Sequence, residues 1–478
     1  MKHDIVIGNP PFQNNIKRGK TQHKLWAPFT ERVFSHWLKP EGYLGWITPQ
    51  SWGSPNSKIL DIFREKDVRC INFDTKHYFP TVASTFSHYV IKNSPSNGPS
   101  TITVDGESFL HEINQETIWV PNILSKESIS VHSKVMFGDA ERHRINYDYV
   151  TCHNVIRHAK SLLDKKMMKV VEKLMEDGIT ELETTSVLER LRSLSEKRAK
   201  AKITVSEVRT DEHVHPLLHT NVKTWYSSIE QSFARGRKVM WSRSGYTKPF
   251  YNNGTVDPLG CTDMGYFINV DSDKEGENLE RFLNSSLMRY IFKTAKWSGF
   301  GNERVFMSIP KIALSGNFND SDVYDSFNLT KEEISHIKET IEPGQRSKSS
   351  RLAEGETKSQ RRIKEFGEVY TPEELVVNIV NDIPREVWQK PGSTVLDPAC
   401  GHGNFVLGGI ARKIDCGLTP LEALSTTYGC DILEDNVEEC RRRIRKLMKN
   451  YSIEESLVRE VTENNIVQGN SLVDDLFC

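Results

Sequence analysis

The chain has 478 residues, with 63 Lys and Arg against 64 Asp and Glu and a net charge of −1. That length exceeds what one ordinary hydrophobic core fills, so we expect two or three domains. The charge balance excludes a uniformly basic protein, so any nucleic-acid surface has to be local. Eight cysteines without a Cys-x-x-Cys pair indicate free thiols in a reducing compartment. No run of about 18 apolar residues and no signal-peptide pattern is present, which predicts a cytoplasmic protein without a membrane partner.

The most informative stretch is Asn9-Pro10-Pro11-Phe12, which follows an apolar run at residues 4–8. An apolar run ending in glycine predicts a buried parallel strand, and open α/β sheets hold ligands at the carboxyl ends of such strands. Two prolines stiffen the loop, so the Asn9 amide oxygen and the Pro10 carbonyl can both accept from one NH2 group. Phe12 offers a face for stacking a planar base. The alternative is a tight Pro-Pro turn closed by a core Phe12.

Alternating helices and strands are predicted from there to residue 91. Helical spacing covers residues 25–38, with Pro40 and Gly42 as stop signals, and a second helix covers residues 57–66. Strand patterns cover residues 43–49, 68–73 and 85–91. These elements predict half of a doubly wound α/β fold, without a glycine-rich loop of its own and with an unpaired edge strand.

The middle of the chain changes character. Residues 162–175 and 186–201 are strongly helical and predict a helical arm, for which a packing role is the simpler interpretation. His213, His215 and His219 lie close together, but Pro216 interrupts them and no Cys accompanies them, which argues against a zinc site. Thr330 and Glu333 predict a capping box at a helix start.

Cations and aromatic residues interleave at residues 235–254, a mixture that suits phosphate contacts with base contacts beside them. A second such stretch covers residues 293–304, and an ordinary β-rich surface is the alternative for both. Residues 343–364 are polar and basic and predict a flexible linker. The candidate nucleic-acid contacts are Arg237, Lys238, Trp241, Arg243, Tyr246 and Lys248.

The last segment predicts a strand at residues 394–397, a loop with two glycines and then a helix. The glycines allow close approach of a ligand, and the helix contributes its positive end. Asp431 ends the next strand, where ribose hydroxyls are held in this class of fold. A helix at residues 436–448 and a third strand ending in Asn470 follow.

These three strands lack a continuation, and the strand at residues 4–8 lacks a predecessor. Joining them makes one sheet with a ligand crevice at the switch point, a circular permutation that nearby chain ends allow. The predicted parts are residues 1–125 and 365–478, which share the sheet, a helical arm at 126–205, an α+β domain at 206–342 and a basic linker at 343–364.

The tetrad 9–12 and the Asp397 glycine loop resemble the amino-methyltransferases that modify exocyclic amines in DNA, in the permuted beta-type motif order. The similarity is greatest to the adenine-N6 enzymes that carry Asn-Pro-Pro-Phe. It implies a circularly permuted Rossmann-like methyltransferase sheet formed by both chain ends, plus an inserted α+β DNA target-recognition domain with the helical arm.

By this resemblance the catalytic residues are Asn9, Pro10, Pro11 and Phe12, which hold the target amine. The second base-stacking aromatic is Phe86 or Tyr89. Many relatives have Asp where this chain has Asn470. S-adenosylmethionine is expected at Tyr370, Thr371, Pro372, Asp397, Ala399, Gly401, Gly403, Asp431, Ile432 and Asn470.

The implied reaction is direct methyl transfer to adenine N6 in a base flipped out of double-stranded DNA. No Cys nucleophile, metal or strong base is required. A restriction endonuclease is the partner that such a modification enzyme would have, in a bacterial or phage-infected cell.

Three alternatives stay open. The tetrad also suits other planar amines and amides, such as cytosine N4, an RNA base or a glutamine side chain, although the basic-aromatic middle argues against glutamine. A combined restriction-modification enzyme would need a nuclease motif, for which Cys152, His153, Asn154 and His158 are too little. A non-catalytic DNA-binding subunit would not need the complete tetrad and glycine loop.

Overall fold

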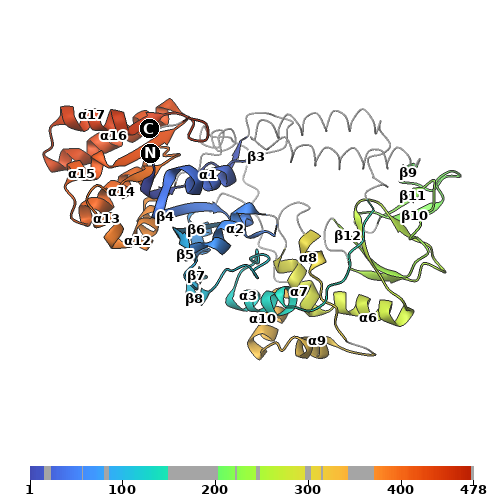
Figure 1. Ribbon diagram of the computed structural model, residues 1–478. Coiled ribbons are helices and arrows are strands. Elements are labelled where there is room, and N and C mark those ends of the chain that lie inside the picture. The colour runs from blue at the N-terminus through green and yellow to red at the C-terminus, as the bar shows by residue number, and fades with distance from the viewer. Residues whose placement is uncertain are drawn as a thin grey trace. The chain divides into compact units, whose positions relative to one another are not determined.

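The computed structural model describes residues 1–14, 23–55, 57–79, 85–148, 203–220, 223–243, 248–295, 303–313, 316–342 and 371–474. The chain divides into two compact units (Figure 1), the first made of Met1–Lys126 and Arg346–Cys478 and the second of Glu127–Gln345. The predicted helices at 162–201, the segment 152–158 and the basic linker at 343–364 lie outside the described residues.

A nine-stranded mixed sheet forms the centre of the first unit, which confirms the predicted α/β class. Its strand order is β18-β17-β16-β1-β4-β6-β5-β7-β8. The strands are β1 (His3–Gly8), β4 (Leu38–Pro49), β5 (Lys66–Asn72), β6 (Phe86–Pro95), β7 (Ser100–Val104), β8 (Glu107–His111), β16 (Val395–Asp397), β17 (Thr427–Asp431) and β18 (Ile466–Gln468).

Strands from distant parts of the sequence meet where β1 lies beside β16. The two are parallel, with Ile5 opposite Val395 and Val6 opposite Leu396. On its other edge β1 pairs with β4, also in parallel. Because β17 and β18 continue the sheet beyond β16, the strand order reverses direction at the β16–β1 junction.

Helices cover both faces of this sheet. On one face Ile379 of α12 (Glu373–Asp382) lies against Gly45, where an added Cβ would be 2.9 Å from its Cγ2. On the other face, Trp46 Nε1 donates to Thr30 Oγ1 of α1 at 3.1 Å. The remaining helices of this unit are α1 (Trp26–Arg32), α2 (Lys58–Glu65), α13 (Arg385–Gln389), α14 (Asn404–Asp415), α15 (Pro420–Ser425), α16 (Glu434–Met448) and α17 (Glu455–Asn465).

The helix predicted at residues 25–38 is shorter than expected. After α1 the chain makes a π-helical turn at Val33–Trp37, and β4 begins at Leu38. The predicted stop signals Pro40 and Gly42 therefore lie inside a strand. Pro40 is tolerated because the register between β1 and β4 shifts there, so no ladder hydrogen bond from its nitrogen is needed.

The second unit contains two small sheets, with strand orders β14-β10-β11-β9 and β13-β12-β15. Its helix α10 begins with the predicted capping box of Thr330 and Glu333, which is confirmed. No helix of the described residues in either unit is both long and apolar enough to cross a membrane. The elements are β9 (Val205–Ser206), β10 (His215–Leu218), β11 (Thr224–Ser227), β12 (Lys238–Ser242), β13 (Phe250–Asn252), β14 (Gly260–Cys261), β15 (Gly265–Asn269), α3 (Lys126–His132), α6 (Asp273–Leu283), α7 (Ser286–Thr294), α8 (Glu303–Met307), α9 (Asp320–Ser326) and α10 (Lys331–Ile341).

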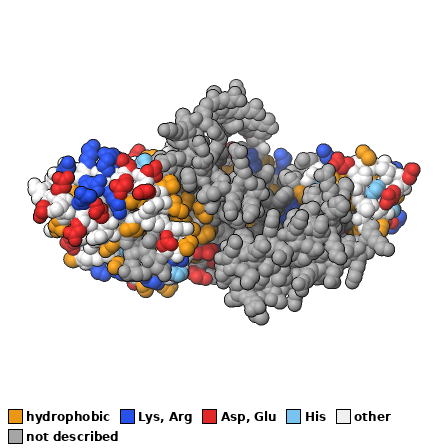
Figure 2. Space-filling view, turned by 90° about the horizontal axis from the view of Figure 1, so that it is seen from above, with side chains coloured by type: hydrophobic (Ala, Val, Ile, Leu, Met, Phe, Trp, Pro, Cys, Tyr) orange, Lys and Arg blue, Asp and Glu red, His pale blue; other side chains and the backbone are white. Residues whose placement is uncertain are grey.

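Charged side chains of both signs share the surface. In Figure 2, Lys and Arg side chains lie among Asp and Glu side chains on the described part of the molecule. Ion pairs within one helix are common among the described residues, such as Arg442 with Glu439 at 2.6 Å and Arg459 with Glu463 at 2.8 Å. Such pairs neutralise each other locally and contribute little to stability.

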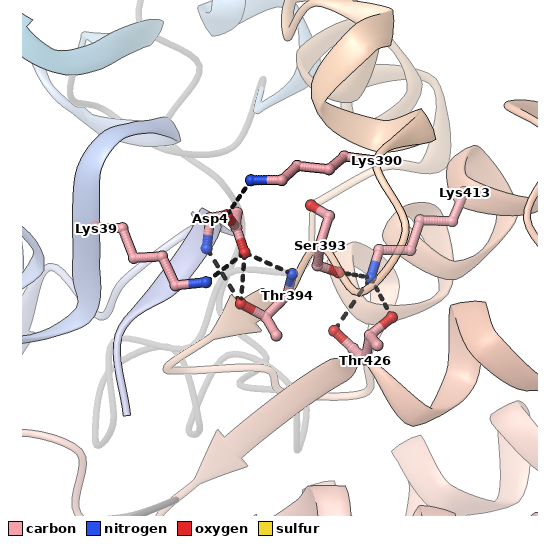
Figure 3. A network of polar contacts seen from close by, with 7 residues as sticks. All are labelled: Asp4, Lys39, Lys390, Ser393, Thr394, Lys413 and Thr426. Carbon is pink, nitrogen blue, oxygen red and sulfur yellow. Dashed lines mark hydrogen bonds and ion pairs between the residues drawn. The ribbon is translucent and has the colours of Figure 1, made fainter.

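The Asp4 carboxylate fastens the β1–β16 junction at its amino end (Figure 3). It accepts from Lys39 Nζ at 2.7 Å, from Thr394 N at 2.9 Å and from Thr394 Oγ1 at 3.0 Å. Burial acts to raise the pKa of Asp4, but the bonds from Lys39 and Thr394 outweigh burial and hold the pKa below its ordinary value. The ionised carboxylate therefore joins three segments of the sheet.

Lys413, a fully buried residue of α14, hydrogen-bonds both turns that precede β16 and β17. Its Nζ donates to Ser393 O at 2.5 Å and to Thr426 O at 3.1 Å (Figure 3). Burial lowers the pKa of Lys413 to about 7. A buried amine is accepted here because carbonyl oxygens satisfy its protons.

Asp4→Ala should lower the free energy of unfolding of the first unit by about 2 kcal/mol, because hydrogen bonds to a charged group are among the strong ones. The matched control is Asp61→Ala, whose carboxylate is exposed and pairs with Arg64 on the surface, with an expected loss below about 1 kcal/mol. The loss of stability caused by Asp4→Ala should disappear as the pH falls through the depressed pKa of Asp4, because the wild-type carboxylate is then protonated. Urea unfolding at pH 7 measures both variants, and equal losses would contradict the assigned role of Asp4.

Candidate functional site

The tetrad lies at the carboxyl end of β1, directly against the loop that follows β16. Gly8 makes this approach possible, because an added Cβ there would be 2.9 Å from Asp397 Oδ1 and 2.9 Å from the Trp46 ring. No larger residue fits without displacing one of the two. Gly8, which directly precedes the tetrad, thus lies against Asp397, the last residue of β16.

Asn9 hydrogen-bonds Thr371, which lies 362 positions later in the sequence. Its Nδ2 donates to Thr371 Oγ1 at 3.1 Å. Thr371 is buried and lies just before α12, next to the N-cap residue Pro372. Pro10 is buried, whereas Asn9 and Pro11 are half-buried at the rim of the site.

Phe12 and Phe86 form an aromatic stack beside the tetrad. Their ring centroids are 5.0 Å apart with an interplanar angle of 25°. Phe12 is half-buried and Phe86 fully buried, so Phe12 packs on the core and keeps part of its surface accessible. Tyr89 follows Phe86 by three residues in β6 and therefore points to the opposite face of the sheet. There it packs edge-on against Phe63, with ring centroids 4.8 Å apart. Phe86 therefore lies on the same face as Phe12 and behind it, whereas Tyr89 does not, and both rings are 0% exposed, so neither presents a free face to a base.

The glycine loop, residues 398–403, turns sharply between β16 and α14. Gly401 and Gly403 have φ values of 50° and 84°, which L side chains rarely adopt. At Gly403 a Cβ would also be 2.4 Å from Cys440 Sγ, so α16 packs directly on the loop. Ala399 N donates to Asp397 Oδ1 at 3.1 Å and closes the first part of the turn.

Asp431, the last residue of β17, hydrogen-bonds the glycine loop. Its Oδ2 accepts from Gly401 N at 2.9 Å, and its Oδ1 accepts from Leu433 N at 3.0 Å and Asn436 Nδ2 at 3.1 Å. The neighbouring Ile432 is 58% exposed. The carboxylate is thereby fixed at the rim of the loop with an accessible apolar side chain beside it.

Asn470 lies in a turn just after β18. Its Oδ1 accepts from Leu472 N at 3.2 Å, and its backbone N–H donates to Asp474 Oδ2 at 2.6 Å. The next residue, Ser471, donates to Pro398 O at 2.6 Å and attaches this turn to the glycine loop. Asn470 is thus near the site, but its amide oxygen already serves the local turn.

Asp397 is the most perturbed acid of the site. Burial raises its pKa to about 8, and the nearby negative charge of Asp431 acts in the same direction, against the hydrogen bond from Ala399. Its side chain is only 2% exposed. A buried carboxyl group with a neighbouring carboxylate favours a cation close by, since a positive charge would relieve both effects.

Two residues near the tetrad, Asn404 and Arg443, were not singled out by the sequence. Asn404 Nδ2 donates to Thr371 O at 2.6 Å, and Arg443 Nη1 donates to His402 O at 2.9 Å and to Asn404 Oδ1. Asn404 lies beside the glycine loop in the sequence, which is a local signal. Arg443 lies in a run of basic residues on α16, and nothing in its spacing points to the site.

Two of the nucleic-acid contacts predicted in the second unit, Lys238 and Trp241, are wrong because both side chains are buried. Lys238 Nζ donates to Ala234 O at 2.8 Å and to Gly236 O at 2.7 Å, and its residue is 0% exposed. Trp241 is 1% exposed and packs edge-on against Phe306. Both side chains belong to the core of this unit and do not reach a phosphate or a base.

The other predicted contacts differ in exposure. Arg237 is exposed and pairs with Asp273 at 2.6 Å, Lys248 is exposed and Arg243 is half-buried. Tyr246, Tyr370 and residues 296–302 lie outside the described residues. In the part of the chain that the structure describes, no group of His, Cys, Asp and Glu side chains is arranged to hold a metal ion.

Two known families match segments that contain the tetrad and the glycine loop. The Eco57I restriction-modification methylase family matches residues 1–85, which contain the tetrad, and the N-6 DNA Methylase family matches residues 356–432, which contain the glycine loop. The comparison with curated proteins gives no match.

Similar solved structures include a chain of a type I R-M system (12% identity, TM-score 0.18, 21% of this chain and 23% of that chain). Another is a nuclease-deletion mutant of the Type ISP restriction-modification enzyme LlaGI in complex with a DNA substrate mimic (11% identity, TM-score 0.34, 68% and 41%). A third is the type IIG restriction endonuclease BpuSI (9% identity, TM-score 0.23, 68% and 45%). The chain spans less than half the length of each. On the family matches at its two ends, it resembles the N6 DNA methyltransferases.

Proposed function

We propose that the protein is a site-specific DNA methyltransferase that transfers a methyl group from S-adenosylmethionine to adenine N6 in a flipped-out base, within a restriction-modification or phage/host modification system. The observation that carries this proposal is the position of Gly8, which directly precedes the tetrad, against Asp397 at the β16–β1 junction. Open α/β sheets bind their ligands where the strand order reverses. In this proposal the sheet is a permuted methyltransferase sheet and the second unit is the inserted target-recognition domain.

The residues around the glycine loop fit the chemistry of S-adenosylmethionine. The buried Asp397 favours the cationic groups of the cofactor, and the fixed Asp431 carboxylate suits ribose hydroxyls. The amino end of α14 favours a carboxylate, and the exposed Ile432 suits the adenine ring. When bound, the cofactor supplies a methyl group on a positively charged sulfur. The residues that would hold it are Thr371, Pro372, Asp397, Ala399, Gly401, Gly403, Asp431, Ile432 and Asn470.

Asn9 and Pro10 would prepare the acceptor. The Asn9 amide oxygen and the Pro10 carbonyl accept the two N–H bonds of the adenine amine, which localises its lone pair on nitrogen. Phe12 stacks on the flipped base, and Phe86 supports Phe12 from behind. An amide is not a base, so the methylated amine gives its proton to water after transfer. Holding amine and methyl donor in line at short distance supplies the rate enhancement.

The second unit would contact the DNA around the target base. Arg237, Arg243 and Lys248 remain the candidates for phosphate contact, because Lys238 and Trp241 are used inside the unit. Double-stranded DNA is the proposed substrate, and a restriction endonuclease is the proposed partner.

Asn9→Ala should reduce methylation by at least about 100-fold, a loss typical when one preorganised hydrogen-bond group of an active site is removed, while DNA binding survives. Expression in a methylation-free host followed by mapping of modified bases measures it, with the wild type modifying one short adenine-containing motif. Asn450→Ala, at an exposed position of the same unit, should leave the signal unchanged. Modification at cytosine N4 would change only the base assignment, whereas an active Asn9→Ala variant would contradict the mechanism.

Asp397 predicts a pH dependence of cofactor binding. Because burial raises its pKa to about 8, the carboxyl group holds its proton at pH 6 and ionises as the pH rises, and only the ionised form attracts a cation. Affinity for S-adenosylmethionine should therefore increase from pH 6 to pH 8.5, by up to tenfold per pH unit for a single group. Calorimetric titration measures it, with Asp397→Asn expected to bind weakly at every pH. An affinity that falls over this range would rule out the assigned role.

The same carboxyl group should lower stability as the pH rises. In the unfolded chain it ionises near its ordinary value, whereas in the folded protein it stays protonated until about pH 8, so the folded state binds the extra proton between these values. Relative to the wild type, Asp397→Asn should gain stability from pH 5 to pH 8, by at most about 1.4 kcal/mol per pH unit. Thermal unfolding of the two proteins at both pH values tests this, and a constant difference would refute it.

A further inference from the structure

A chain of hydrogen bonds leads from Asn9 to helix α16. Asn9 Nδ2 donates to Thr371 Oγ1 at 3.1 Å, and Thr371 O accepts from Asn404 Nδ2 at 2.6 Å. Asn404 Oδ1 accepts in turn from Arg443 Nη1, which also donates to His402 O at 2.9 Å. Asn9, Thr371, His402, Asn404 and Arg443 all belong to the first unit.

The orientation of the Asn404 amide in this chain is fixed by its two partners. A guanidinium group only donates, so the oxygen of Asn404 has to face Arg443. A backbone carbonyl only accepts, so the NH2 group has to face Thr371 O. If the amide were reversed, its NH2 group would face the Arg443 donor and its oxygen would face the Thr371 carbonyl oxygen. Neither pair can form a hydrogen bond, which excludes that orientation.

The residues of this hydrogen-bond network belong to, or directly precede, three different helices. Asn404 is the first residue of α14, Arg443 lies in the middle of α16, and Thr371 immediately precedes the N-cap residue of α12. Thr371 is 5% exposed and the Arg443 side chain is 24% exposed, so water has little access to replace a broken bond. The position of Thr371 is therefore set by α14 and α16.

The Asn9 amide has to present its oxygen, and not its NH2 group, to a target amine. A hydroxyl partner can donate or accept, so the Thr371 hydroxyl alone does not fix which way the Asn9 amide turns. In the structure the amide nitrogen Nδ2 faces Oγ1 at 3.1 Å, which turns the Asn9 oxygen away from Thr371. A shift of Thr371 by a fraction of an ångström would weaken the bond that keeps the NH2 group turned away from the substrate.

We propose that Asn404 and Arg443 are positioning residues, which act through Thr371 to hold the Asn9 amide with its oxygen toward the acceptor amine. This inference rests on the proposed methyltransferase function of the same site. Neither residue touches the acceptor, so both act on the rate of transfer. The competing explanation is that the two residues only stabilise the glycine loop, which would affect folding and cofactor binding and leave the rate of the bound enzyme unchanged.

Arg443→Ala tests the far end of the chain. It should lower kcat about tenfold, the usual effect of losing one or two hydrogen bonds that orient a catalytic group, while KM for DNA and the Kd for S-adenosylmethionine stay within about twofold. Arg443→Lys, which still offers a donor, should recover part of the rate. The matched control is the adjacent Arg442→Ala, since Arg442 pairs on the surface with Glu439 and should change neither constant.

Thr371 tests the link to Asn9. Thr371→Val removes the hydroxyl at nearly constant volume and should lower kcat about tenfold, and Thr371→Ser should restore most of that loss. A rise in the Kd for the cofactor with unchanged kcat for Arg443→Ala, or an unchanged kcat for Thr371→Val at saturating cofactor, would overturn the proposal in favour of the purely structural explanation.

A second measurement decides the proposal without activity. In a double-mutant cycle of Asn9→Ala and Arg443→Ala, the shift in urea midpoint of the double variant should be smaller than the sum of the single shifts, because both break one network. Additive shifts would refute the network. If the wild type methylates no DNA, the proposed function fails while this cycle still reports whether the network exists.

Discussion

The parallel pairing of β1 with β16 is the contact on which the rest of the first unit depends. At its amino end the pairing is secured by the Asp4 carboxylate, which bonds both Lys39 and Thr394. At its carboxyl end Gly8 lies against Asp397 with no room for a side chain. In the proposed function neither half of the site acts without the other, because one carries the amide for an acceptor and the other carries the acids and glycines of a donor loop. The register of two strands thus sets the geometry of the proposed reaction.

Much of this fold can be predicted from the sequence because its signals are local. An apolar run ending in glycine, a Gly-x-Gly loop before a helix and a Thr-x-x-Glu cap each specify their own conformation. The failures come where local signals conflict with tertiary structure. Pro40 and Gly42 indicate a helix end, yet they lie in β4, since the strand can shift its register there. Strands β7 and β8 at the far edge are short and partly polar, and nothing in their sequence marks them.

The candidate site divides in the same way. The tetrad and the glycine loop are contiguous motifs, so the order of the amino acids alone is enough to find them. The choice between Phe86 and Tyr89 cannot be made in this way, because strand alternation tells that they face opposite ways but not which face holds the site. Lys238 and Trp241 fit a basic-aromatic pattern equally well as surface or as core, and only the carbonyls around Lys238 Nζ decide for the core. Arg443 reaches the site through space alone.

The Asp4–Thr394 bonds span 390 positions of the chain. At a synthesis rate of about 5–20 residues per second, the ribosome needs roughly 20–80 s to travel from one to the other. Throughout that interval the edge of β1 that will receive β16 has no partner strand, and exposed strand edges invite pairing with other chains. The growing polypeptide thus carries the proposed acceptor loop well before the proposed donor pocket exists. Under the proposed function, an unfinished copy bound to the ribosome cannot methylate DNA, and its nascent sheet edge is where we expect chaperones to be needed.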